Sequence, residues 1–137
     1  MGQARFLIVT RPARGAAGRG ETYTAWRLLS ANNRELGRGL ANFRDEESCR
    51  RAVVGLRTDI ERGVAVMCRE QTTSMWGWRL DIDDQAVAQS ARSYRRQREC
   101  LYNLAQFRAG VTGVDPAHVI PHLVRATVRD RIELAGA

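Results

Sequence analysis

The chain contains one segment twice. Residues 43–49 (FRDEESC) return as residues 94–100 (YRRQREC), and each pair of positions is 51 residues apart. Upstream, residues 26–28 (WRL) return as residues 78–80 at a spacing of 52. A repeat of this length indicates two copies of one supersecondary unit packed together. About 50 residues bury little surface alone, so the copies are expected to share a hydrophobic core.

The length and composition place this repeat in a globular protein. Of the 137 residues, 44% are hydrophobic, which is typical of a folded domain. We expect a first copy over residues 1–60, a second over residues 61–113 and a tail over residues 114–137. No apolar run approaches the ~20 residues of a membrane span, and no signal peptide is recognisable. The three cysteines are odd in number and without close pairs, which fits reduced thiols, so these features favour a soluble protein of the cytoplasm.

The first copy reads as three strands and a helix. Strands are predicted over Arg5–Thr10, Thr24–Ala31 and Leu36–Asn42 from short apolar or alternating runs. Asp45 is a favourable N-cap, so the helix is expected to start after it. Its inward stripe follows helical spacing and consists of Cys49, Ala52, Val53 and Leu56.

The second copy repeats this order. Strands are predicted over Val64–Glu70, Trp76–Ile82 and Ala86–Ser93, and a helix over Gln97–Arg108. Arg96 stands at the cap position in place of an acid, so this helix should begin less cleanly. The side chains expected to point inward are Cys100, Leu104 and Phe107.

Two segments lie outside the repeat. Residues 11–20 form an arginine- and glycine-rich loop between the first two strands. The tail, residues 114–137, is predicted to contain a helix after Pro121. A strand remains the alternative, because apolar residues also alternate there at Val124, Ala126, Val128, Ile132 and Leu134.

These features resemble the YegP-like family, whose pattern is an aromatic residue, a helix cap and small or aliphatic residues at fixed helical positions. The match covers residues 5–110, although the family's turn glycine is absent and Asn103 stands where a small residue is usual. The resemblance implies an α+β fold of two tandem βββα repeats related by a pseudo-twofold, with helices on one face of an antiparallel sheet. It implies no reaction, cofactor or catalytic residue. The matching positions are Phe43, Asp45, Cys49, Ala52, Val53 and Leu56, then Tyr94, Cys100, Leu104 and Phe107.

The residues that could carry catalysis fit structural roles better. Cysteines on inward helix stripes behave as small hydrophobic residues. His118 and His122 are four residues apart, but Pro121 lies between them and no further metal-ligand pattern is visible. The carboxylates at residues 81–84 suit a hairpin turn, and the glycines of the loop lack the ending of a phosphate-binding motif. We therefore expect no enzyme, no cofactor and no metal.

Charge is the feature that points to a partner. All 22 basic residues are arginine and the net charge is +7, which suggests a polyanion, although genomic base composition also explains the absence of lysine. The shared tryptophan position is assigned to the core. The arginines predicted to bind nucleic acid or another anion are Arg11, Arg14 and Arg19 in the loop, Arg27 and Arg79 on equivalent strands, and Arg92, Arg95, Arg96 and Arg98 near the second helix.

Two functions follow as hypotheses. The first is a non-catalytic module that contacts nucleic acid, or an assembly containing it, through its arginines. The alternative is a protein-interaction or self-association module that docks on an acidic partner or a second copy through a sheet edge or the tail. A clustered arginine surface favours the first, and arginines scattered among acidic partners favour the second.

Overall fold

The computed structural model describes residues 4–12, 22–113 and 124–129, and in it the order of three strands and a helix occurs twice. A last strand follows the second helix. The elements are β1 (Arg5–Pro12), β2 (Thr22–Leu29), β3 (Glu35–Gly39), α1 (Glu46–Asp59), the short 3-10 helix η1 (Ile60–Arg62), β4 (Val64–Glu70), β5 (Trp76–Ile82), β6 (Gln85–Gln89), α2 (Gln97–Thr112) and β7 (Val124–Arg129).

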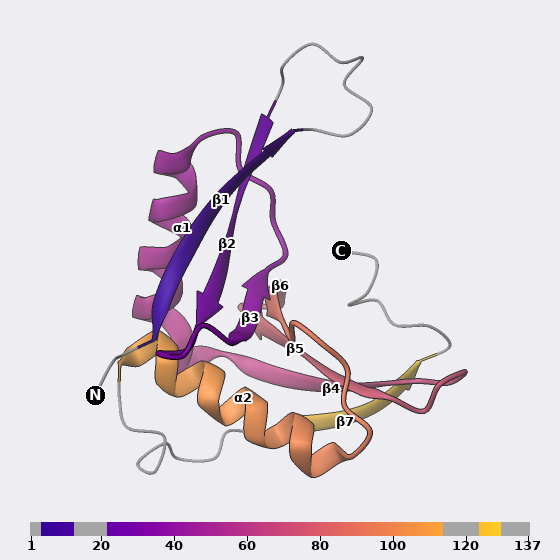
Figure 1. Ribbon diagram of the computed structural model, residues 1–137. Coiled ribbons are helices and arrows are strands. Elements are labelled where there is room, and N and C mark those ends of the chain that lie inside the picture. The colour runs from indigo at the N-terminus through magenta and orange to yellow at the C-terminus, as the bar shows by residue number, and fades with distance from the viewer. Residues whose placement is uncertain (1–3, 13–21, 114–123, 130–137) are drawn as a thin grey trace.

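All strands form one sheet in the order β1-β2-β3-β6-β5-β4-β7. Each copy contributes three antiparallel strands, and the two copies join where β3 pairs with β6, with Arg38 opposite Gln89 and Gly39 opposite Ala88. Both helices lie on the same face, with α1 along β1 and β2, and α2 against β5 of its own copy and β3 and β2 of the first (Figure 1). The predicted α+β fold of two βββα units with helices on one face is therefore confirmed.

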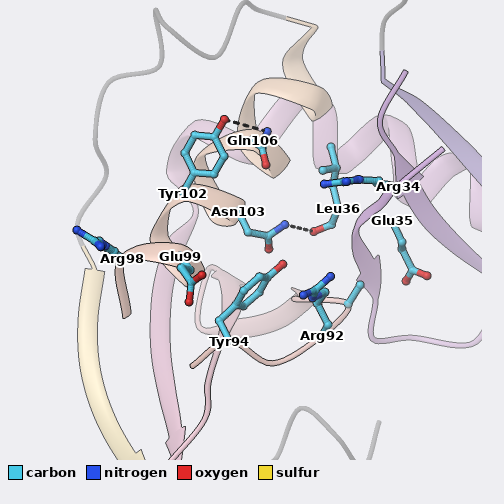
Figure 2. Close-up of a pocket in the computed structure, with 11 residues that line it drawn as sticks. Arg34, Glu35, Leu36, Arg92, Tyr94, Arg98, Glu99, Tyr102, Asn103 and Gln106 are labelled. Carbon is cyan, nitrogen blue, oxygen red and sulfur yellow. Dashed lines mark hydrogen bonds between the residues drawn. The ribbon is translucent and has the colours of Figure 1, made fainter. Parts of the chain in front are cut away.

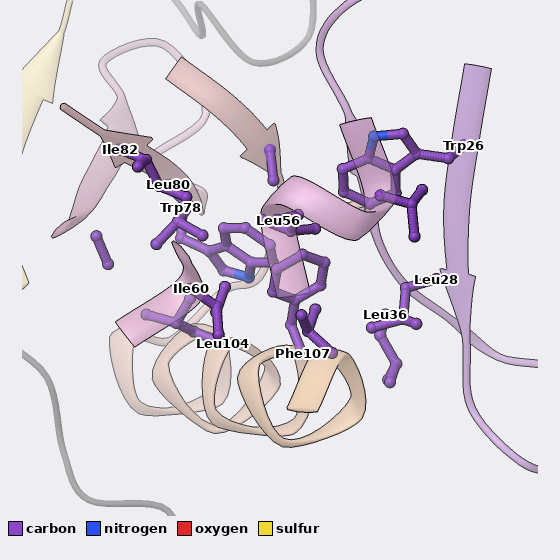
Figure 3. Packing of buried hydrophobic residues seen from close by; sticks show 14 of the residues in the cluster. Trp26, Leu28, Leu36, Leu56, Ile60, Trp78, Leu80, Ile82, Leu104 and Phe107 are labelled. Atoms are coloured by element: carbon purple, nitrogen blue, oxygen red, sulfur yellow. The ribbon is translucent and has the colours of Figure 1, made fainter. Parts of the chain in front are cut away.

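The core lies between the helices and the sheet, and aromatic rings from both copies meet in it. The Phe107 ring of α2 lies 4.7 Å from the Trp78 ring and 6.2 Å from the Trp26 ring, measured between centroids (Figure 3). Cys49 and Cys100 are fully buried beside them. The predicted core roles of the repeated tryptophans and helix cysteines are confirmed.

The glycines of β3 make room for these rings. A Cβ atom added to Gly37 would lie 2.5 Å from Cδ1 of Phe107, and one added to Gly39 would lie 2.5 Å from Nε1 of Trp26. The irregularity in register falls on the partner strand, between Leu28 and Leu29. These glycines therefore permit close packing of aromatic side chains against the backbone.

The helix termini follow their cap residues. In α1 the Asp45 carboxylate accepts a 2.7 Å hydrogen bond from the backbone N–H of Ser48, as the sequence predicted. In α2 the Glu99 carboxylate accepts a 3.2 Å hydrogen bond from the backbone N–H of Arg96. An acid in the first turn of the helix therefore pairs with a backbone donor at the N-terminus. The helix also continues four residues past the predicted Arg108 and ends at Gly113, whose φ of 76° suits glycine.

The helix predicted in the tail is wrong for Val124–Arg129, which form β7. This strand pairs in parallel with β4, placing Val124 opposite Ala65 and Arg129 opposite Glu70. The edge of β4 offers a row of unpaired backbone groups that an added strand satisfies, and β-branched residues such as Val124 and Val128 favour that state. The remaining tail, with His118 and His122, lies outside the described residues.

Candidate functional site

The structure separates the predicted binding arginines into three places. Arg11, near the end of β1, is exposed, whereas Arg14 and Arg19 lie outside the described residues. Arg95 and Arg96 are exposed just before α2. The structure thus places one arginine of the loop and does not bring it together with the cluster near α2.

Arg27 and Arg79 occupy equivalent positions on the sheet face away from the helices, and each has an acidic partner. The Arg27 guanidinium lies 3.7 Å from the Glu35 carboxylate, and Arg79 lies 2.8 Å from Asp81. Glu35 also pairs with Arg38 at 2.7 Å. These acids offset much of the positive charge on this face.

A groove of about 1020 Å³ lies between the turn before β3 and the first half of α2 (Figure 2). It brings Arg34 of the first copy together with Arg92 and Arg98 of the second. In the view of Figure 2, Tyr102 and Gln106 lie above Asn103, and Tyr94 and Arg92 lie below it. The residues that line the groove are Arg34, Glu35, Leu36, Ala91, Arg92, Tyr94, Arg98, Glu99, Tyr102, Asn103 and Gln106.

The two acids of the groove already have partners. Glu35 is held by Arg38, and Glu99 accepts the backbone N–H of Arg96. In the part of the chain that the structure describes, Arg34, Arg92 and Arg98 form no ion pair. Three exposed arginines therefore line one groove, and their guanidinium groups have donors available for an anion.

Two tyrosines lie among these arginines. The Arg92 guanidinium lies 5.3 Å from the centroid of the Tyr94 ring, and partial burial raises the pKa of the Tyr94 hydroxyl above its usual value. Tyr102 is 66% exposed, and its hydroxyl accepts a 3.4 Å hydrogen bond from Gln106. The groove thus offers an exposed aromatic ring beside positive charge, which suits planar, anionic ligands.

The floor of the groove is a buried amide. The Asn103 Oδ1 atom accepts a 2.6 Å hydrogen bond from the indole N–H of Trp78, and its Nδ2 donates to the backbone carbonyl of Leu36 at 3.2 Å. These bonds fix the amide and attach α2 to both copies. Asn103 therefore shapes the groove, with its side-chain oxygen and nitrogen each in a hydrogen bond.

The pseudo-twofold gives this groove a counterpart of about 380 Å³ on the other copy. The counterpart is lined by small side chains where the first groove is polar, because the chain has Ala41, Ala52 and Gly55 at the positions 51 residues before Arg92, Asn103 and Gln106. Equivalent positions of the fold thus carry polar side chains in the second copy and small side chains in the first. The two grooves therefore differ in size and in the polarity of their linings.

Sequence reasoning missed Arg34 and Tyr102. Arg34 belongs to the first copy and joins the groove only through the pairing of β3 with β6. A signal was present, because comparing the two copies position by position marks the change from small to polar residues around α2. No helix in residues 4–12, 22–113 and 124–129 is long and apolar enough to cross a membrane. The same part of the chain contains no group of three or more His, Cys, Asp or Glu residues that could hold a metal ion.

The fold defines a class of small protein in which two βββα repeats share one sheet and carry both helices on one face. The solution structure of YegP from E. coli, a protein of unknown function, has this fold: it matches with a TM-score of 0.53 and 12% identity, over 80% of this chain and 86% of YegP. The resemblance to the YegP-like family is thus confirmed at the level of the fold. No family model matches the chain, and no curated protein matches its sequence.

Proposed function

We propose that the protein is a non-catalytic module that binds nucleic acid through the groove beside α2. The observation that carries the proposal is that Arg34, Arg92 and Arg98 all line one groove whose two acids are already engaged. Guanidinium groups donate paired hydrogen bonds to phosphate oxygens, and several together follow a phosphate backbone. The net charge of +7 adds a general attraction to polyanions.

The non-catalytic part of the proposal rests on the cysteines. Cys49, Cys68 and Cys100 are all buried, and burial raises the pKa of the Cys100 thiol to about 12. A nucleophilic thiol needs exposure and a lowered pKa, so these side chains suit packing. Free thiols persist in a reducing compartment, and we place the protein in the cytoplasm on that ground.

Fluorescence anisotropy with labelled DNA and RNA over a salt series tests the proposal. The double variant Arg92→Gln/Arg98→Gln is compared with Arg51→Gln/Arg57→Gln, which removes the same charge from exposed positions of α1. We expect the groove variant to lower the slope of log affinity against log salt by about 1–2, because each lost phosphate contact releases one counterion fewer. The α1 variant should retain most of the slope.

The loop is tested separately with Arg11→Gln/Arg14→Gln/Arg19→Gln, since only Arg11 lies in the described residues. A reduced slope in this variant as well would add the loop to the interface. Equal losses from the groove and α1 variants, or binding that disappears at physiological salt, would contradict a nucleic-acid site in the groove.

A second candidate function is self-association through β1, which is supported by its position at the end of the sheet. In the part of the chain that the structure describes, β1 pairs only with β2, and Leu7 is 41% exposed on it. An eight-residue edge with an apolar side chain is suited to pairing with another strand. Sedimentation velocity across the micromolar range distinguishes the cases: a constant monomer mass counts against self-association, and a dimer that Leu7→Lys dissociates supports it.

A further inference from the structure

We infer that the groove binds a single strand, with one unpaired base stacked on the ring of Tyr102 and the neighbouring phosphates held by Arg98, Arg92 and Arg34. This inference rests on the proposed function and narrows its ligand from nucleic acid in general to unpaired nucleic acid. It is argued from the arrangement of aromatic and guanidinium groups in the groove.

The position of Tyr102 is the first step. The Tyr102 ring is 66% exposed on a helix, so a ligand can reach its face, and a flat ring face suits a flat base. In a duplex each base face is covered by the next base pair, so such a ring finds nothing to stack on. In a single strand the faces are accessible, and stacking on aromatic side chains is how many proteins hold such strands.

The spacing of Arg98 and Tyr102 is the second step. The two residues are four apart on α2, so their side chains are neighbours on one face of the helix, with Cβ atoms about 5–6 Å apart. Arginine and tyrosine side chains are both long, so together they can reach two parts of one ligand of nucleotide size. One nucleotide can therefore contact both side chains at once.

Arg92 and Arg34 supply the third step. The Arg92 guanidinium lies over the Tyr94 ring, 5.3 Å from its centroid, a cation–π contact that holds the cation at the groove. Arg34 also lines the groove, from the segment of the first copy just before β3. Phosphates on either side of the stacked base thus meet guanidinium groups from two different elements, and a volume of about 1020 Å³ accommodates more than one nucleotide.

The repeat-related groove provides an internal comparison. At the positions 51 residues before Arg98 and Tyr102 the first copy has Glu47 and Arg51, so an acid stands in place of the arginine and the exposed tyrosine is missing. Only one of the two grooves has the features that a single strand requires. We therefore expect one strand-binding groove per chain.

The test compares a short single-stranded oligonucleotide with the same sequence annealed to its complement, using the full chain. Wild type should bind the single strand about tenfold or more tightly. Tyr102→Leu removes the ring but keeps apolar bulk, and it should weaken single-strand binding about 5- to 100-fold, since stacking of one base contributes at that level. Tyr102→Phe keeps the ring and should bind like wild type.

A fluorescent adenine analogue in the strand reports stacking directly. Its emission should be quenched on binding to wild type and to Tyr102→Phe, and should stay bright with Tyr102→Leu. Tyr102 is exposed, so both variants should fold, and circular dichroism checks this. Equal binding of duplex and single strand, or a Tyr102→Leu variant that binds and quenches like wild type, overturns the inference.

The outcomes separate this inference from the proposed function. If Arg92→Gln/Arg98→Gln loses affinity but Tyr102→Leu does not, the groove binds phosphates without reading unpaired bases, and only the inference fails. If neither oligonucleotide binds wild type at physiological salt, both fail together.

Discussion

The indole N–H of Trp78 donates a 2.6 Å hydrogen bond to the side-chain oxygen of Asn103, which lies 25 residues later on α2. The nitrogen of the same amide donates to the backbone carbonyl of Leu36 on β3. One buried side chain therefore connects a strand of each copy to the second helix. Buried polar groups of this kind stabilise a fold only while every member has its partner.

Replacing Asn103 with alanine should therefore be costly. Asn103→Ala leaves the buried Trp78 indole N–H without an acceptor and the Leu36 carbonyl without this donor, and we expect the free energy of unfolding to fall by about 2–3 kcal/mol. Urea denaturation followed by tryptophan fluorescence measures the loss. The same substitution at the exposed Asn42 is the matched control and should change stability by about 0.5 kcal/mol or less. Equal effects at the two sites would contradict a structural role for the amide.

The repeat explains how much of this fold the sequence could predict. Equivalent positions such as Trp26 and Trp78 fixed the element order and the inward face of each copy, because alternation and helical spacing depend on neighbouring residues alone. The parallel pairing of β7 with β4 was not predictable in this way. It depends on an open strand edge created by the fold, and the apolar spacing of the tail fits a helix as well as a strand.

The candidate site was only partly predictable for a related reason. The charge cluster near α2 was visible, because Arg92 and Arg98 are close in sequence. Arg34 is more than 50 residues away and reaches the same groove through the pairing of β3 with β6. Local patterns also could not show that Arg27 and Arg79 have acidic partners, since those ion pairs depend on side-chain positions across and along the strands.

The close packing of Gly37 against aromatic rings gives a second stability prediction. Gly37→Ala places a methyl group 2.5 Å from Cδ1 of Phe107 and 2.9 Å from the Trp78 ring, so the rings must shift and the free energy of unfolding should fall by about 1–3 kcal/mol. Gly55→Ala is the control, because Gly55 lies within α1 and an added Cβ meets nothing within 4 Å. That variant should gain about 0.5–1 kcal/mol from helix propensity. Thermal or urea unfolding measures both variants. A loss of stability in Gly37→Ala alone would show that contact with the aromatic rings is what requires glycine at this position.

The ion-paired arginines should contribute little to nucleic-acid binding. Arg79→Gln removes a guanidinium that already pairs with Asp81 at 2.8 Å. The Asp81 carboxylate left behind lies outside the groove, so the affinity for nucleic acid should stay within about twofold of wild type. Arg98→Gln removes a groove arginine and should weaken binding by about three- to tenfold, the scale of one typical net hydrogen bond. Anisotropy titrations at one salt concentration compare them. A larger loss of affinity from Arg79→Gln than from Arg98→Gln would indicate that nucleic acid binds the sheet face opposite the helices.

The buried Cys100 thiol should make stability depend on pH in the alkaline range. Burial raises its pKa from 9.0 to about 12, so between these values the unfolded chain loses a proton that the native protein keeps. Stability from this group is complete below pH 9 and declines as the pH rises, by about 1.4 kcal/mol per pH unit at most. Urea unfolding at pH 8 and pH 10 measures the decline for wild type and for Cys100→Ala, which lacks the thiol. The variant starts less stable because it leaves a small cavity, but its loss between the two pH values should be smaller by about 1 kcal/mol. Identical losses in the two proteins would show that the thiol is not held protonated by the core.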